Sequence, residues 1–262
     1  MTARRAPADR ATGIGKAYPD RVDVRGRDLC SELIGRVGFT EYFHLLLTGS
    51  EPSEDQRFFL DALLVAIAEH GLMPSNVAAR MTLAADPESL QGAVAAGILG
   101  AGPVVLGTAG ECARLLVAAN TRVIAGEAPT EAAAALAGEI HVSGGRVPGF
   151  GHPLHRPVDP RAERILELTD ERGVSGEHVL VARCLRDAVA DLWGPEIPMN
   201  VSMPIAAVML DLGYSAGDVE AVPILARTAS LLAHLAEEQS APLGFLMAGA
   251  AEEAVEYEPR EG

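Results

Sequence analysis

The amino-acid sequence predicts an all-α protein, and its composition is the first reason. Hydrophobic residues make up 48% of the 262 residues but aromatic residues only 4%, so Ala, Leu and Val must build the core. Such residues favour close-packed helices over sheets. The second reason is the spacing of apolar residues. Only residues 21–26 alternate as a strand does, and no regular succession of strands and helices follows.

Start and stop signals place the individual elements. Residues 1–20 are expected to form a mobile arm, and residues 21–26 a short strand or extended segment. The expected helices cover residues 39–47, 53–70, 74–85, 87–99, 108–125, 130–140, 160–172, 177–192, 203–212 and 218–238. The helix that ends near His70 is apolar almost all round from Phe58 to Ala68, which predicts that it is buried.

A loop rich in glycine and proline carries the most informative chemistry. His152 lies between Gly151 and Pro153. Glycine allows backbone angles closed to other residues and proline restricts the backbone, so we expect the loop to hold the imidazole in one orientation. Asp159 then predicts a helix N-cap, which places Arg161 in the first turn of the next helix. A guanidinium can grip a carboxylate with two N–H groups, beside a histidine able to exchange a proton near neutral pH.

The charge distribution predicts where an anionic ligand would bind. The net charge of −15 argues against a general nucleic-acid or anionic-membrane surface, so an anion needs a local basic pocket. Between residues 141 and 164 the balance is reversed by Arg146, Arg156, Arg161, Arg164 and three histidines. The alternative is a solvated charged face. The chain has a single lysine, Lys16, which argues against Schiff-base chemistry.

Cysteine usage and the absence of targeting signals predict a cytoplasmic protein with no membrane association. The three cysteines, Cys30, Cys112 and Cys184, are widely spaced and form no Cys-x-x-Cys pair, so we expect buried, reduced thiols. No secretory signal opens the chain, and no uninterrupted apolar run is long enough to span a bilayer.

The loop also carries a family resemblance. Gly-Phe-Gly-His at residues 149–152, followed by Asp-Pro-Arg at 159–161, resembles a signature of the citrate synthase superfamily. Three further segments resemble that family in the same order: residues 28–52, residues 69–80 and residues 226–237. The resemblance implies that His152 handles the oxaloacetate carbonyl or citrate hydroxyl and that Arg161 holds a carboxylate. It further implies that His70 contacts the dicarboxylate and that Arg227 binds a second carboxylate.

The resemblance also implies a fold and a domain plan. The expected fold is citrate-synthase-like and all-α, with a large helical domain at residues 1–111 and 210–262. A smaller inserted domain at residues 112–209 would carry the histidine loop. Compared with ordinary citrate synthases, this chain lacks roughly a hundred residues between Gly49 and His70. The shortened plan is similar to the citryl-CoA lyase module of ATP-citrate lyases.

Two departures from the family pattern concern the chemistry. Residues 102–111 contain no histidine to polarise a thioester carbonyl, and Ser202 stands where the superfamily has aspartate. A serine has no basic lone pair near neutral pH without an activating base. Ser202, a water molecule or Glu111 must therefore replace the missing carboxylate.

The resemblance, with its shortened plan, implies a carbon–carbon lyase that cleaves citryl-CoA to acetyl-CoA and oxaloacetate. Two alternatives remain: a condensing enzyme or lyase for another 3-hydroxyacyl-CoA, and a catalytically silent homologue that binds CoA or a dicarboxylate. No bound cofactor is expected, since coenzyme A enters as part of the substrate, and Arg146 and Arg156 are candidates for its phosphates. A homodimer is expected. A metal site at His141, His152 and His155 is not, because the loop offers neither cysteines nor a carboxylate pair.

Overall fold

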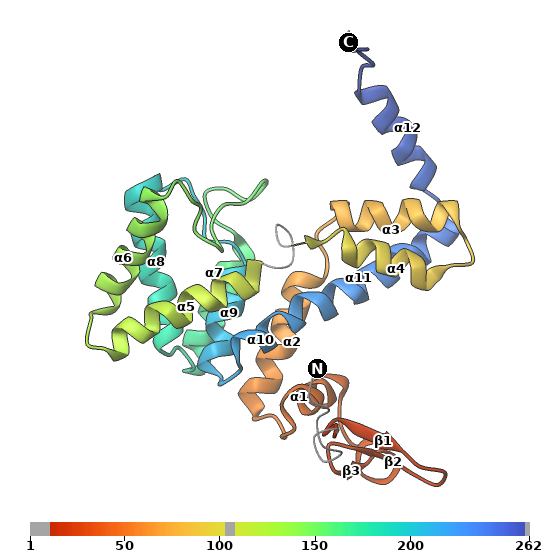
Figure 1. Ribbon diagram of the computed structural model, residues 1–262, viewed down its shortest axis with the longest axis horizontal. Coiled ribbons are helices and arrows are strands. Elements are labelled where there is room, and N and C mark those ends of the chain that lie inside the picture. The colour runs from red at the N-terminus through yellow and green to blue at the C-terminus, as the bar shows by residue number, and fades with distance from the viewer. Residues whose placement is uncertain (1–10, 103–107, 260–262) are drawn as a thin grey trace, which may run out of the picture. The chain divides into compact units, whose positions relative to one another are not determined.

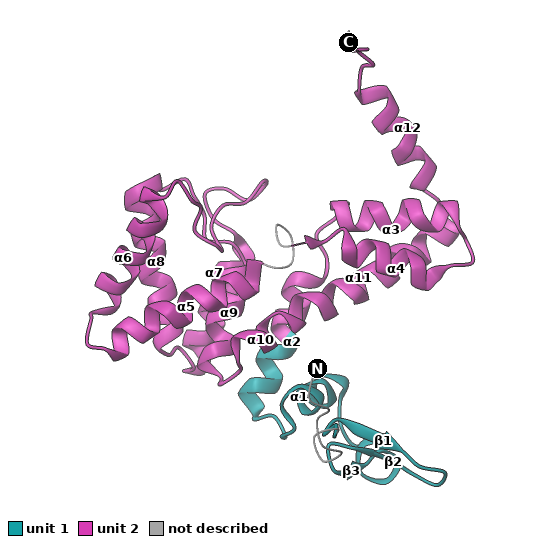
Figure 2. Ribbon diagram, in the orientation of Figure 1, with its two compact units in different colours: residues 1–61 teal, residues 62–262 magenta. Residues whose placement is uncertain are grey.

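The computed structural model describes residues 11–102 and 108–259 and is mainly helical (Figure 1). Its contacts divide the chain into two compact units, Met1–Asp61 and Ala62–Gly262 (Figure 2). The all-α prediction is confirmed. The expected domain boundaries at residues 111 and 209 both fall inside the second unit and stay a prediction.

The first unit begins with a small antiparallel sheet, in the order β1, β2, β3. Its strands are β1 (Gly15–Ala17), β2 (Val22–Val24) and β3 (Arg27–Asp28). The strand expected at residues 21–26 is thus confirmed. The expectation of a mobile arm is wrong for Gly15–Ala17, because this segment pairs with Val22–Val24. Residues 1–10 of the expected arm lie outside the described residues.

Helices complete the first unit. A π-helical segment, η2 (Leu29–Leu33), leads to α1 (Phe39–Thr48), and the first half of α2 (Glu54–Ala68) follows. Val24, Leu33 and Leu45 form the core that joins the sheet to the helices. Helix α1 ends at Gly49, whose φ of 81° is the left-handed conformation that glycine adopts readily.

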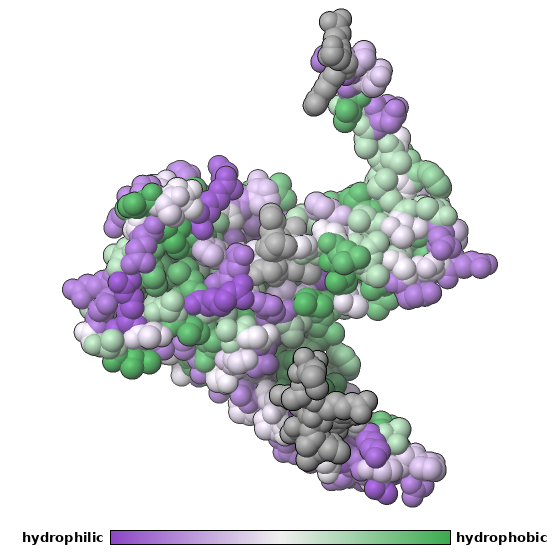
Figure 3. Space-filling view, viewed as in Figure 1, coloured by the Kyte–Doolittle hydropathy of each residue, from purple (hydrophilic) through white to green (hydrophobic). Residues whose placement is uncertain are grey.

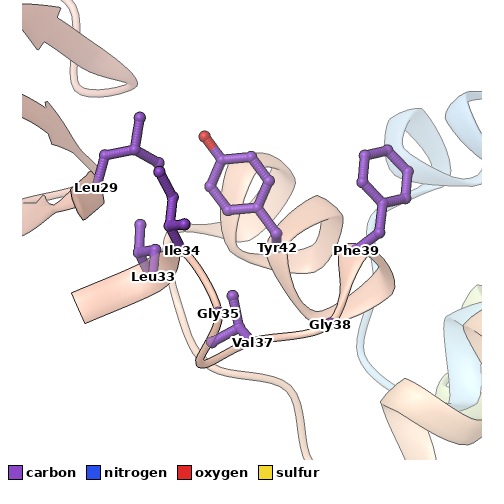
Figure 4. A pocket seen from close by; sticks show the side chains of 8 residues that line it. All are labelled: Leu29, Leu33, Ile34, Gly35, Val37, Gly38, Phe39 and Tyr42. Atoms are coloured by element: carbon purple, nitrogen blue, oxygen red, sulfur yellow. The ribbon is translucent and has the colours of Figure 1, made fainter. Parts of the chain in front are cut away.

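An apolar pocket of about 270 Å³ lies in the first unit (Figure 4). Its wall is formed by Leu29, Leu33, Ile34, Gly35, Val37, Gly38, Phe39 and Tyr42. Figure 4 shows Phe39 and Tyr42 projecting from helix α1 and Leu29, Leu33 and Ile34 from the segment before it. The lining contains no carboxylate, histidine or arginine, and none of the candidate catalytic or ligand-binding residues named from the sequence.

One group of helices in the second unit packs around a shared apolar core. The helices are α3 (Pro74–Ala85), α4 (Leu90–Leu99) and α11 (Ala221–Ser240), and α12 (Gly244–Ala254) contacts α3 outside this core. Their core is formed by Ala79, Leu83, Ala93, Leu231 and Leu235. Gly97 permits the close approach of α4 to α11, since a Cβ atom there would lie 2.6 Å from Leu231.

A buried ion pair links α3 to the end of α11. Arg80, 1% exposed, donates to Glu238 at 3.0 Å and also pairs with Glu237. Glu238 in turn accepts the backbone N–H groups of Leu243 and Gly244, at the start of α12. Burial alone would raise the pKa of Glu238, but these N–H groups and Arg80 outweigh it and lower the pKa. The pair therefore fixes where α12 begins.

The remaining helices of the second unit surround α9 (Ser202–Asp211), which is buried along most of its length. Those in contact with α9 are α5 (Thr108–Ile124), α7 (Pro160–Arg172), α8 (Glu177–Trp193) and α10 (Ala216–Val219), while α6 (Pro129–Val142) packs against α5 and α8. At the end of α9, Asp211 accepts the backbone N–H groups of Gly176, His178 and Val179 and so caps α8.

Several predicted boundaries differ from the structure. The helix expected to reach His70 ends at Ala68, because the Glu69 side chain accepts the Gly71 N–H and closes a turn there. The helix expected from residue 87 begins at Leu90. The one expected at residues 218–238 is two helices, α10 and α11, and the first starts at a capping box formed by Ser215 and Asp218.

Burial also differs at two places. Helix α2 is not buried all round, because Val65 is 80% exposed while Phe59, Leu63 and Ile67 face the interior. All three cysteines are free, yet Cys30 is exposed and only Cys112 is fully buried. The surface in Figure 3 is correspondingly mixed, with hydrophobic residues at the base of α12 and over α3 and α4.

Among the described residues, one helical stretch is long and apolar enough to cross a membrane by length and composition alone. It is Ala216–Ser240, and 44% of its most apolar window is buried inside the structure. A core helix of a water-soluble protein meets the same criteria, so this stretch is weak evidence for a membrane span.

Candidate active site

The histidine loop is attached to the segment that precedes α9. Gly151 donates its N–H to the carbonyl of Pro198, and Asn200 donates its N–H to the carbonyl of Gly149, both at 2.8 Å. The Asn200 side chain also donates to the carbonyl of Gly151 at 3.0 Å. These bonds bring Ser202 next to a loop that lies about fifty positions earlier in the chain.

Gly149 is required at the base of this loop. Its φ is +80°, and a Cβ atom there would lie 2.7 Å from the Cys112 sulfur and 2.8 Å from the Met203 Cβ. Gly151 also has a positive φ, of +87°, but nothing lies within 4 Å of its missing Cβ. Close packing therefore adds to the backbone requirement at Gly149 only.

Asp159 joins the loop, Arg161 and the start of α9. Its carboxylate is fully buried, caps α7 through the Arg161 N–H, and accepts the Val201 N–H at 3.1 Å. Its two oxygens also accept Arg161 Nε at 3.0 Å and Nη2 at 2.8 Å. Burial alone would raise the pKa of Asp159, but the hydrogen bonds and charge of Arg161 outweigh it and lower the pKa.

Backbone contacts fix the tautomer of His152. Its Nδ1 accepts the backbone N–H groups of Leu154, at 3.1 Å, and His155, at 2.9 Å. A nitrogen that accepts two N–H groups carries no proton, so the neutral ring is protonated on Nε2. Nε2 lies 3.3 Å from Arg161 Nη2. Both of these nitrogens are donors, so an acceptor from a ligand is needed to satisfy them.

Burial and nearby positive charge keep His152 neutral at physiological pH. Desolvation is the main cause that lowers the pKa of His152, to about 4, and charge on His155, Arg161 and His70 adds to it. Asp159 opposes the shift. The imidazole is therefore an uncharged N–H donor rather than a cation near pH 7.

Three histidines cluster beside the loop. The ring centroid of His152 lies 5.1 Å from that of His70 and 4.3 Å from that of His155. His141 lies elsewhere, with its ring centroid 4.6 Å from that of Trp193. One nitrogen from each clustered ring lies within 4.8 Å of the others, a spacing that a metal ion could use. The proton on His152 Nε2 and the adjacent Arg161 both oppose cation binding there.

Arg227 is a buried cation without a carboxylate partner among the described residues. The residue is 3% exposed, its Nε has no hydrogen-bond partner, and its Nη1 lies 3.5 Å from the Asn76 side-chain oxygen. Burial lowers the pKa of Arg227. The buried Nε2 of His70 also lacks a partner, and burial lowers the pKa of this histidine. Unsatisfied buried polar groups are costly, so both groups indicate a missing ligand.

These side chains surround one cavity of about 440 Å³ in the second unit. Its lining is Ile67, His70, Met73, Pro74, Thr108, Gly151, His152, Pro153, Arg161, Asn200, Val201, Ser202 and Arg227. Two arginines and two histidines face the cavity, and its described lining contains no aspartate or glutamate. The cavity is therefore suited to an anion with two or more acceptor groups.

The structure gathers some of the sequence-derived candidates and leaves others outside. His70, His152, Arg161, Ser202 and Arg227 line the cavity. Glu111, Arg146 and Arg156 are exposed and are not part of its lining. Arg164 is paired with Glu167 and Glu171 on the surface of α7. Residues 103–107, within the segment where the family histidine is missing, lie outside the described residues.

Sequence reasoning missed two residues that shape this site. Asn200 orients the loop through Gly151 and accepts the Ser202 N–H at 3.1 Å; its place two residues before Ser202 was the available signal. Asp159 was expected to be only a helix cap, but it also positions the Arg161 side chain. The available signal was the Asp-Pro-Arg motif, which places the aspartate and the arginine two residues apart.

Comparison with known proteins identifies the family. A family model described as the C-terminal domain of citrate synthase matches residues 18–243. The chain belongs to the citrate synthase family. No protein of curated function matches the sequence.

Solved structures of the citrate synthase family show which members the chain resembles. It is 27% identical to citryl-CoA lyase from Hydrogenobacter thermophilus, with a TM-score of 0.83 and 96% of each chain covered. It is 20% identical to ATP citrate lyase from Methanothrix soehngenii, determined with citrate and coenzyme A, with a TM-score of 0.77. That match covers 98% of this chain but 43% of the other. Citrate synthase from Thermotoga maritima is 19% identical, with a TM-score of 0.64 and coverages of 78% and 55%.

Proposed function

We propose that this protein cleaves citryl-CoA to acetyl-CoA and oxaloacetate. The observation that carries the proposal is the cavity in which buried Arg227 lacks a partner carboxylate and Arg161 faces the same space. Two fixed cations suit a substrate with two free carboxylates. Full-length similarity to a citryl-CoA lyase supports the lyase direction. A second solved structure of this fold is the D541A mutant of Methanosaeta concilii ATP citrate lyase, in complex with (3S)-citryl-CoA.

In the proposed reaction the tertiary hydroxyl loses its proton and becomes the carbonyl oxygen of oxaloacetate. The bond between C3 and the acetyl carbon breaks, its electron pair forms the thioester enolate, and that carbon then takes a proton. Arg161 and Arg227 hold the carboxylates so that the breaking bond is aligned with the thioester. His152 Nε2–H donates to the oxygen as charge develops on it.

The proton transfers use the remaining groups of the cavity. His70 Nε2 is buried and has no hydrogen-bond partner. We therefore assign its lone pair as the base that receives the hydroxyl proton. Ser202 lines the cavity where the superfamily has aspartate. Because Glu111 is not part of the described lining, Ser202 or a water molecule that it orients is favoured as the donor to the enolate carbon.

Coenzyme A binding is proposed to use Arg146 and Arg156. Both are exposed, and neither forms an ion pair with another described residue. Guanidinium groups bind phosphates well. A double Arg146→Ala, Arg156→Ala variant should bind coenzyme A at least ten-fold more weakly than the parent does. It should bind pantetheine, which carries no phosphate, as well as the parent does.

The experiment that tests the proposal follows oxaloacetate release from citryl-CoA by the purified protein. His152→Ala should cut turnover by roughly 100-fold or more and leave coenzyme A affinity nearly unchanged. His141→Ala is the matched control, because His141 packs against Trp193 away from the cavity, and it should keep parental turnover. No oxaloacetate release by folded parent protein would overturn the citryl-CoA assignment.

Ser202 favours a second candidate, a lyase for another 3-hydroxyacyl-CoA. Loss of the family carboxylate changes the chemistry at the acyl carbon, and a different acyl group could require that change. The same assay with other 3-carboxy-3-hydroxyacyl-CoA thioesters distinguishes the candidates. Binding of coenzyme A and dicarboxylate without turnover of any thioester would identify a catalytically silent homologue.

A cytoplasmic homodimer is the proposed state of the protein. Helix α12 projects from the helices that it joins (Figure 1), and Phe245 and Leu246 on it are 74% and 68% exposed. Isolated short helices are marginal in water, so a partner surface is needed, and a second copy is the simplest one. Sedimentation should show a dimer at micromolar concentration, and Phe245→Glu should shift it toward monomer.

A further inference from the structure

His155 takes no part in the proposed reaction, yet it contacts His152 in two ways. Its ring stacks on the ring of His152, with centroids 4.3 Å apart and planes 26° apart. Its backbone N–H donates to His152 Nδ1 at 2.9 Å. The same ring meets His70 edge to face, with centroids 5.4 Å apart. One residue thus touches both histidines that line the cavity.

His155 itself does not line the cavity. Any effect it has on a bound ligand must therefore pass through its neighbours. We infer that His155 is a positioning residue that holds the His152 ring by stacking and fixes its Nε2–H tautomer, so that the donor points into the cavity. This inference deepens the proposed function. Its test by turnover rests on that function, whereas its test by NMR does not.

The geometry gives the stack two separable consequences. An aromatic ring at position 155 limits rotation of the His152 ring about its side-chain bonds, whatever its charge. An imidazole at that position can also carry charge, and two stacked cations repel each other. Charge on His155 accordingly helps to lower the pKa of His152. The other groups that face His152 are His70 and Arg161, which act in the same direction, and Asp159, which opposes them.

Two substitutions separate these consequences. His155→Phe keeps a stacking ring and the backbone N–H but removes the charge. His155→Ala keeps the backbone N–H but removes both the ring and the charge. His141→Phe is the matched control, because it replaces another histidine ring that packs against an aromatic neighbour, Trp193, away from the cavity.

The primary readout is ¹⁵N NMR of His152, which needs no substrate. The parent should show the Nε2–H tautomer and a low pKa. His155→Phe should keep the tautomer and raise the His152 pKa by about half to one unit, the scale of one nearby charge. His155→Ala should raise the pKa further, since the ring becomes more hydrated, and should broaden the ring signals. His141→Phe should change none of these. An unchanged His152 pKa in both position-155 variants, with sharp ring signals in His155→Ala, would overturn the inference.

The second readout is turnover of citryl-CoA. At pH 7.5, His155→Phe should keep kcat within about two-fold, whereas His155→Ala should lower kcat about ten-fold with little change in KM, as loss of orientation predicts. The NMR result stands even if citryl-CoA is not the substrate, so failure of the proposed function and failure of this inference remain distinguishable. Equal kcat in the parent and in folded His155→Ala would contradict a positioning role.

Discussion

Asp159 holds Arg161 through two side-chain hydrogen bonds, Nε to Oδ1 at 3.0 Å and Nη2 to Oδ2 at 2.8 Å. The carboxylate is fully buried and also accepts the Val201 N–H. One anion therefore aims a cavity-facing guanidinium and fixes the start of α9. Stability and ligand binding depend on the same contact.

Asp159→Asn is expected to lower the free energy of unfolding by about 3 kcal/mol, because it leaves the Arg161 side chain without its buried anion. The pKa of Asp159 is lowered by folding, so its contribution is complete above about pH 4 and is lost as the pH falls further. Urea unfolding of the variant should therefore depend less on pH below 4. Asp170→Asn, which removes an exposed pair with Arg183, should cost less than about 1 kcal/mol.

Arg227→Met should separate stability from binding. Removing a buried cation that lacks a carboxylate partner relieves a desolvation cost, so thermal stability of the unliganded protein should stay equal or rise. Affinity for oxaloacetate should fall by about 1.5 to 3 kcal/mol, the scale of a charged hydrogen-bond partner. Differential scanning fluorimetry and calorimetric titration measure the two effects. A variant that unfolds earlier and binds equally well would show that Arg227 is structural.

The histidine cluster predicts an acid-side loss of stability. The pKa of His152 falls to about 4 on folding, and that of His70 is also lowered. As the pH falls, the two histidines are therefore protonated in the unfolded chain before they are protonated in the folded protein. The free energy of unfolding should be unaffected by them above about pH 6.5 and should decline from about pH 6.5 toward 4. For His152 this loss is about 2 kcal/mol after allowance for its partial exposure. In His152→Gln the decline should be shallower when chemical unfolding is measured at each pH.

Gly149→Ala and Gly151→Ala form a matched pair. Both glycines have a positive φ, but only at Gly149 would a Cβ atom clash, with Cys112 and Met203. Gly151→Ala should cost about 1 kcal/mol from backbone strain alone, and Gly149→Ala at least about 2 kcal/mol more. Thermal unfolding of the two variants provides the comparison, and equal losses would contradict the packing argument.

Ser202→Asp tests what replaced the family carboxylate. The new carboxylate would stand where the superfamily has its base, so exchange of the acetyl-CoA methyl protons with deuterated solvent should increase. Ser202 is buried, so the new group carries a desolvation cost, and circular dichroism must first show that the variant is folded. No gain in exchange, with an active parent, would place the missing base elsewhere and make Glu111 the next residue to change.

Sequence patterns located helices well where local signals were strong. Asp159 and Gly173 bound α7 at the predicted residues, because an N-cap and a left-handed C-cap act within one turn. Helix α12 was not predicted, since its start depends on Glu238 and on packing against α3 rather than on a local signal. Strands β1 and β3 were not predicted, because segments of three and two residues are too short to show alternation and their pairing depends on tight turns.

The candidate site was predicted only in part, because motifs identify residues but not the contacts between distant segments. The motifs pointed to His70, His152, Arg161, Ser202 and Arg227, and the structure places all five around one cavity. The motifs did not reveal that Arg227 lacks a carboxylate partner among the described residues, or that the His152 tautomer is fixed by backbone N–H groups. Both depend on distances in the folded structure, which the spacing of residues along the sequence does not give.

The cationic lining of the cavity has a practical consequence for solution work. Small polycarboxylates and inorganic phosphate used as buffers present the same acceptor groups as the proposed substrate, so they should occupy the cavity and raise the melting temperature with the logarithm of their concentration. Citrate buffer is the natural choice near pH 4 to 6, where the histidine titration is to be followed, and it would compete there. Salt at moderate concentration should weaken this occupancy, because added ions screen the arginines. Titrations in buffers of zwitterionic sulfonates would leave Arg161 and Arg227 open to the ligand under test.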